Sequence, residues 1–257
     1  MVTKNQAFGL LLCSLAAACD VGAGGRPIVF QVAVAPAAEL DLFTTGEGWD
    51  VHLAEACVGL GPIYIWAAPS HLGAAAATLR SWALGTAWAH VGDSHFNGGA
   101  VRAEFLNPFV VHPLRTDAVG VGLAQGLEGP VGSFSLLLPV VGPNLADATC
   151  LRGHSAYVVG LAVKGETSVP FEGGLDIENI GTNRRIDGLP LNAVLTDNVQ
   201  LRLASHPKVW LDQVAFEKLP GPSASGRFVI TPETQAHRAW FIGLRAAGSF
   251  TAVVQPP

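Results

Sequence analysis

Two histidines and an aspartate stand close together in the glycine-containing segment His90-Val-Gly-Asp93-Ser-His95-Phe-Asn-Gly-Gly. Neutral imidazole nitrogens are suitable ligands for copper, zinc, iron and nickel, and a carboxylate can complete or orient such a site. A glycine-rich loop can bend so that these groups meet on one ion. The residues His90, Asp93 and His95 therefore suggest a site for a copper or zinc ion, although their spacing matches no standard metal motif.

A further ligand for such a site must come from elsewhere in the chain. His154 and His71 are the main candidates, and His52 and His112 are less favoured. We include His154 in the predicted metal set. The alternative interpretation is that these histidines are ordinary polar loop residues that bind no metal.

The stretch Gly153-His154-Ser155-Ala156-Tyr157 imitates the nucleophile turn of serine hydrolases over four residues. Tyr157 replaces the final glycine of that motif, and the residues that follow predict a strand where the motif requires a helix. We therefore interpret Ser155 as a turn residue. No nucleophile, base and orienting group can be matched elsewhere, so the sequence does not predict an enzyme.

The N-terminal residues have the pattern of a bacterial lipoprotein signal: Lys4, an apolar run from Ala7 to Ala18, and then Cys19 directly after small residues. We predict a signal peptide over 1–18, a lipid on Cys19 within a flexible tether over 19–27, and a single β-rich domain over 28–257. An ordinary cleaved signal or a membrane span is the alternative, but the run is shorter than the ~20 residues that a spanning helix needs. The expected location is the cell envelope, at a membrane facing the periplasm or the cell surface.

Two cysteines remain as potential partners if Cys19 carries a lipid and Cys13 leaves with the signal. Disulfides persist in exported proteins, so the sequence predicts a bond between Cys57 and Cys150. Two buried thiols are the alternative.

The composition is that of a folded chain, with 49% hydrophobic and 14% charged residues and a formal net charge of −5. Lysine and arginine are scattered almost singly, so there is no basic stripe to displace counterions from phosphates. Nucleic acid is therefore not an expected partner.

Short segments of alternating polar and apolar residues, separated by glycine, proline, aspartate and asparagine, predict a mainly β fold. We expect an antiparallel β-sandwich or barrel-like domain with one or two short helices, one over Ala74–Trp82 and one that is capped by Thr231 and ends before Gly248. The expected strands are Ile28–Val34, Trp49–Leu53, Ile63–Trp66, Val101–Leu106, Ser133–Leu138, Ala156–Val163, Val169–Ile177, Val199–Leu203, Val209–Phe216 and Ser249–Val254.

Several stretches carry a resemblance: GWDVHLAEACVGLGPIYIW, the histidine-containing segment, RGHSAYVVGLAVKG with VPFEGGLDI, and VWLDQVAFEKL. Together they resemble a group of uncharacterised envelope lipoproteins from Gram-negative bacteria. The order of strands and loop is also loosely similar to the methanobactin-associated periplasmic copper-binding proteins, which are β-sandwiches that hold copper through histidines and an oxidised tryptophan. That similarity implies a comparison of His90 and His95 with the family's histidines, and of Trp88 with its modified tryptophan.

These observations lead us to expect a lipid-anchored envelope protein that binds a transition metal, copper or zinc. A Cu(I) site would normally recruit methionine or free thiolate, and the only methionine is Met1. The alternative is a non-catalytic interaction module that contacts other envelope proteins through an exposed sheet. In either case we expect the lipid on Cys19 to attach the protein to the membrane.

Overall fold

The computed structural model describes residues 25–37, 41–68, 100–139, 148–177 and 184–257. Within them the strands are β1 (Pro27–Val34), β2 (Leu42–Thr44), β3 (Asp50–Leu60), β4 (Ile63–Ala67), β5 (Val101–Phe105), β6 (Phe109–Val111), β7 (Val119–Leu127), β8 (Gly129–Leu137), β9 (Ala156–Lys164), β10 (Thr167–Leu175), β11 (Arg185–Leu195), β12 (Gln200–Ser205), β13 (Phe228–Ile230) and β14 (Phe250–Gln255). The helical elements are η1 (Ala148–Leu151), α3 (Pro207–Leu211), η2 (Phe216–Lys218) and α4 (Gln235–Leu244). The prediction of a mainly β fold with short helices is confirmed, although the helix predicted over Ala74–Trp82 lies outside the described residues.

The larger sheet has the strand order β11-β8-β4-β5-β7-β1-β12-β14. Its two end strands, β11 and β14, also contact each other, so the sheet closes almost completely into a barrel-like shape. Its ladders are antiparallel except for the parallel pair β1 and β12. These two strands are far apart in the chain, as a parallel pair requires, since it cannot be joined by a tight hairpin.

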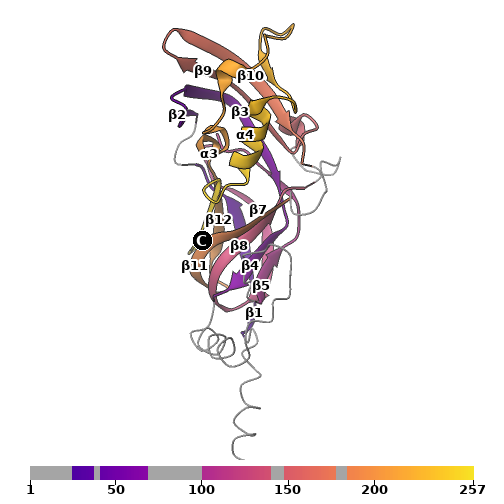
Figure 1. Ribbon diagram of the computed structural model, residues 1–257. Coiled ribbons are helices and arrows are strands. Elements are labelled where there is room, and N and C mark those ends of the chain that lie inside the picture. Colours follow the sequence, from indigo (N-terminus) through magenta and orange to yellow (C-terminus); the bar gives the residue numbers. More distant parts are fainter. Residues whose placement is uncertain (1–24, 38–40, 69–99, 140–147, 178–183) are drawn as a thin grey trace, which may run out of the picture.

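The smaller sheet has the order β13-β10-β9-β3-β2, and β6 pairs with β3 beside this path. It packs against the larger sheet. Figure 1 shows β2, β9 and β10 at one end of an elongated molecule and β1, β4 and β5 toward the other, with α3 and α4 alongside. The pair β10 and β13 is parallel and the others are antiparallel.

Strand β3 links the two sheets because the chain turns directly from its end into β4. The turn requires glycine at position 61, where φ is +116° and a Cβ would lie 2.8 Å from the carbonyl oxygen of Asn107. As predicted, Val51 and Leu53 are buried while Asp50 and His52 are exposed. A register shift between Leu53 and Glu55 then changes which residues of β3 face the core.

Aromatic side chains fill the core between the sheets and the helices. Phe216 lies between Trp49 and Phe171, with ring centroids 5.7 and 4.8 Å away. Trp210 of α3 and Trp240 of α4 are fully buried. The predicted strand over Val209–Phe216 is wrong: its first residues belong to α3, where the neighbours Trp210 and Leu211 are both buried, a pattern that an alternating strand on one sheet face does not give.

The predicted C-terminal helix exists as α4, but its cap is Thr234, whose hydroxyl accepts a hydrogen bond from the backbone nitrogen of His237. Thr231 lies outside the helix and accepts from Thr234 through its carbonyl oxygen. The final strand is confirmed as β14. Among the described residues, no helix combines the length and apolar character that a membrane span needs.

Candidate functional site

Four positions form a row across one face of the smaller sheet. Cys57 of β3 is paired with Tyr157 of β9, and Tyr157 is paired with Gly174 of β10. On the other side of β3, Val58 is paired with Val111 of β6, so the next step of this ladder places His112 beside Cys57. Successive side chains of a strand point to opposite faces of the sheet. Because the side chain of Val58 faces the core, that of Cys57 points to the other face.

Cys57 forms a disulfide with Cys150, which lies outside this row. Their sulfur atoms lie 2.20 Å apart and their Cα atoms 6.2 Å apart, so the predicted pair is present at disulfide distance. Cys150 belongs to η1, which contacts both β3 and β9. Cys57 is buried under this segment, whereas Cys150 is partly exposed.

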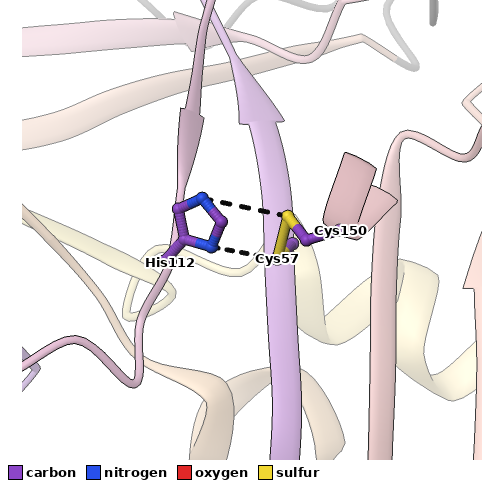
Figure 2. Close-up of side chains that lie close together, drawn as sticks. All are labelled: Cys57, His112 and Cys150. Carbon is purple, nitrogen blue, oxygen red and sulfur yellow. Dashed lines mark hydrogen bonds between the residues drawn. A yellow bond between two sulfur atoms is a disulfide. The ribbon is translucent and has the colours of Figure 1, made fainter. Parts of the chain in front are cut away.

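The imidazole of His112 lies against the two sulfurs (Figure 2). Its Nδ1 atom is 3.2 Å from Sγ of Cys57, and its Nε2 atom is 3.9 Å from Sγ of Cys150. Among the described residues these three side chains form the group of potential metal ligands whose ligand atoms all lie within 4.8 Å of one another. The sequence favours His154 over His112 as a metal ligand, because nothing in the residues around His112 indicates that the β3–β6 ladder brings it next to Cys57.

On the other side of the disulfide, Arg152 and Tyr157 form a polar cluster. Arg152 donates from Nη1 to the Tyr157 hydroxyl at 3.0 Å and from Nη2 to Oε2 of Glu55 at 2.8 Å. Its guanidinium carbon lies 4.5 Å from the centre of the Tyr157 ring. Burial raises the pKa of Tyr157, and the negative charge of Glu172 raises it further, while Arg152 acts in the opposite direction. Tyr157 is therefore a neutral phenol near pH 7.

His154 lies at the end of the same row. Its Nδ1 atom is 3.0 Å from Oδ1 of Asp176, and its ring stacks on Tyr157 with 6.0 Å between ring centroids and 15° between planes. The ring covers Gly174, where a Cβ would come within 2.2 Å of it. Glycine at position 174 thus leaves the space that the imidazole occupies.

The structure places only part of the predicted metal set. His154 is on this face with a carboxylate partner, but His90, Asp93, His95 and His71 lie outside the described residues, as does Cys19. Ser155 is buried, and its hydroxyl accepts a hydrogen bond from the backbone nitrogen of Ile177 at 3.1 Å. This contact agrees with the interpretation of Ser155 as a structural residue at the start of β9.

The search for relatives gives no match to any protein-family model, curated protein or solved structure. The chemistry of the described face is therefore the basis on which a function is proposed.

Proposed function

We propose that this chain is an exported, lipid-anchored protein of the cell envelope that binds a divalent transition-metal ion, Cu(II) or Zn(II). The observation that carries the metal proposal is the contact between His154 and Asp176. A carboxylate at 3.0 Å from Nδ1 favours the tautomer with a proton on Nδ1. The lone pair of Nε2 is then available to a metal, as in the carboxylate–histidine–metal arrangement of many metalloproteins.

The surroundings of His154 favour a ligand role over that of an ordinary surface histidine. Tyr157 stacks on its ring, Gly174 lies beneath it, and its side chain still has 36% of its surface exposed. An imidazole held in place loses little rotamer freedom when it binds an ion. In the proposed site His154 acts together with His90, Asp93 and His95.

The envelope location is supported by the residues before Cys19 and by the pairing of Cys57 with Cys150, because disulfides persist in oxidising compartments. The lipid on Cys19 would be the membrane attachment, and 19–27 would be the tether between that lipid and β1.

The test is a metal titration of the oxidised protein, followed by thermal unfolding. If Cu(II) or Zn(II) binds the native state, a concentration of 100 times the dissociation constant stabilises it by about 2.7 kcal/mol. His154→Ala should lose most of this shift, as should the double variant His90→Ala, His95→Ala. His52→Ala removes an exposed imidazole from β3 and should respond as the parent does.

Two results would reject the metal proposal: a parent protein without any shift, or a His154→Ala variant whose shift equals that of the parent. If instead the parent responds to metal and His154→Ala does not, elemental analysis of protein purified from its own envelope distinguishes copper from zinc.

A second candidate function is supported by the outer surface of the larger sheet. Val29 of β1, Leu123 of β7 and Val253 of β14 are 50%, 61% and 54% exposed. Gln31 of β1 and Gln200 of β12 are hydrogen-bonded to each other on the same sheet. Transient protein interfaces have such a mixture of apolar and polar surface, so this face is a candidate for binding another envelope protein.

The interaction function would be tested by the size of the complex that the solubilised protein forms. Leu123→Lys should reduce an assembly to the single chain if this face is an interface. An assembly of unchanged size would count against that role.

A further inference from the structure

We propose that Cys57, Cys150 and His112 form a second metal site, which is closed in the disulfide form and opens when the disulfide is reduced. In the reduced form two thiolates and one imidazole nitrogen would bind a thiophilic ion, Zn(II) or Cu(I). This site is separate from the one proposed at His154, and it does not depend on that proposal.

The distances within the group are close to those of a metal site. With Zn–S bonds of about 2.3 Å and Zn–N bonds of about 2.0 Å, tetrahedral geometry requires sulfur and nitrogen to lie about 3.5 Å apart and the two sulfurs about 3.8 Å apart. Nδ1 of His112 lies 3.2 Å from Sγ of Cys57, and one ligand atom from each of the three residues lies within 4.8 Å of the other two. Because one ion is bound by only one nitrogen of the ring, binding requires a small turn of the imidazole as well as separation of the two sulfurs once their bond is broken.

The backbone holds the three ligands independently of the disulfide. Cys57 is in the middle of a strand that is paired with β9 on one side and, one residue further along, with β6 on the other. The Cys150 segment, η1, contacts both β3 and β9, and its last residue, Leu151, is fully buried. Reduction should therefore leave the ligands close together, and a preformed arrangement favours metal binding.

Two of the three ligands are accessible from solvent. His112 lines a cavity of about 230 Å³ whose other walls include Val34, Phe109, Arg115 and Asp117, and Cys150 is partly exposed. A bound ion would have three protein ligands and one position open to water or to a partner's ligand, as in zinc sites that exchange a ligand.

A dithiol can act as the reductant that opens the Cys57–Cys150 disulfide. The dithiol gives two electrons and two protons to the Cys57–Cys150 bond and becomes a disulfide itself, which leaves two protein thiols. Binding of Zn(II) then displaces both thiol protons to solvent. Two thiolates neutralise the charge of Zn(II), so the partly buried site carries no net charge and its desolvation cost is smaller than that of a charged site.

The experiment uses Co(II) as a spectroscopic probe for the Zn(II) site. The full chain with Cys13→Ser and Cys19→Ser, in which Cys57 and Cys150 are the remaining cysteines, is reduced with dithiothreitol, freed of it by gel filtration without oxygen, and titrated with Co(II). We expect thiolate-to-cobalt charge-transfer absorption that saturates at one ion per chain and is displaced by Zn(II). The oxidised protein should lack this absorption, whatever it binds at His154.

Substitutions test which side chains bind the metal ion. The double variant Cys57→Ser, Cys150→Ser should lose the absorption, and His112→Ala should keep a weaker form of it with an affinity at least about tenfold lower. His52→Ala is the histidine control in β3, the strand that also holds Cys57, and His154→Ala separates this site from the other. Neither control should change the reduced protein's absorption.

The site assignment fails if the reduced protein shows no thiolate-to-cobalt absorption, or if His112→Ala binds Co(II) as the parent does. Circular dichroism of the same samples monitors the fold, and a reduced chain that unfolds and is not refolded by Zn(II) also overturns the proposal. Transfer of Cu(I) from its bicinchoninate complex, compared with the Zn(II) affinity, decides which ion the site prefers.

Discussion

Cys57 and Tyr157 lie directly opposite each other in the antiparallel ladder of β3 and β9. This pairing places a disulfide and its neighbour His112 on one side of the row, and Tyr157 with Arg152 and His154 on the other. One sheet face therefore carries both groups with metal-binding chemistry among the described residues. Because the two groups come from different strands and turns, substitutions can test them separately.

The disulfide should account for a large part of the stability of the chain. The two cysteines are separated by 93 residues, and closing a loop of this length stabilises a fold by about 4.6 kcal/mol in the chain-entropy model. The double variant Cys57→Ala, Cys150→Ala should therefore unfold at a lower urea concentration than the oxidised parent. Peptide mapping without reductant should find the two peptides joined, and free thiols at both positions in freshly exported protein would refute the bond.

If Cys19 carries the proposed lipid, membrane attachment depends on one sulfur atom. Cys19→Ser should move the protein from the membrane fraction to the soluble fraction, because each buried CH₂ of an acyl chain contributes about 0.8 kcal/mol to membrane binding. Fractionation of cells that express the parent and the variant measures this. A variant that stays with the membranes would show that another feature attaches the chain.

The larger elements of the fold were predictable because their signals are local. Alternation over Ile28–Val34 and Trp49–Leu53 predicted β1 and the start of β3, and glycine and proline marked the turns. The strand predicted over Val209–Phe216 failed because Pro207 starts a helical turn whose burial depends on packing against other elements. Strand order and the two parallel pairs depend on tertiary contacts, which a single sequence does not specify.

The candidate site was predictable only in part. The cysteine pair follows from elimination once Cys13 is assigned to the signal and Cys19 to the lipid, and His154 is predicted only as one of the histidines that could add a ligand to the His90 segment. The importance of His112 depends on the β3–β6 register, and that of Asp176 and Gly174 on the β9–β10 register. These relationships are long-range, so no spacing in the chain reveals them.

Gly174 should matter for metal binding more than for stability. A Cβ at this position would lie 2.2 Å from the ring of His154, so Gly174→Ala should displace the imidazole from Asp176 and Tyr157. The His154 side chain is at the surface and can move outward, so we expect a stability loss below about 1.5 kcal/mol. The Cu(II)- or Zn(II)-induced shift in unfolding temperature should nevertheless fall by more than half.

The matched control for this substitution is Gly120→Ala in β7, where a Cβ would meet nothing within 4 Å. It should keep the metal response of the parent. A Gly174→Ala protein that keeps the full response would mean that the position of His154 over Gly174 is not required.

The last prediction concerns pH and rests on His237 in α4. Burial lowers the pKa of this imidazole below its ordinary value of 6.5, while Asp176 and Glu233 act to raise it and Arg238 to lower it. The unfolded chain takes up a proton at this residue as the pH falls through about 6.5, but the native state does so only at lower pH. Stability from this residue is therefore complete above that pH and is lost as the pH decreases below it.

His237→Gln should reduce the loss of unfolding free energy between about pH 7.5 and about pH 5, measured by urea denaturation of metal-free protein. His52→Gln is the control for an exposed histidine. An identical loss in the parent and in His237→Gln would show that burial of His237 does not contribute to the acid sensitivity of the fold.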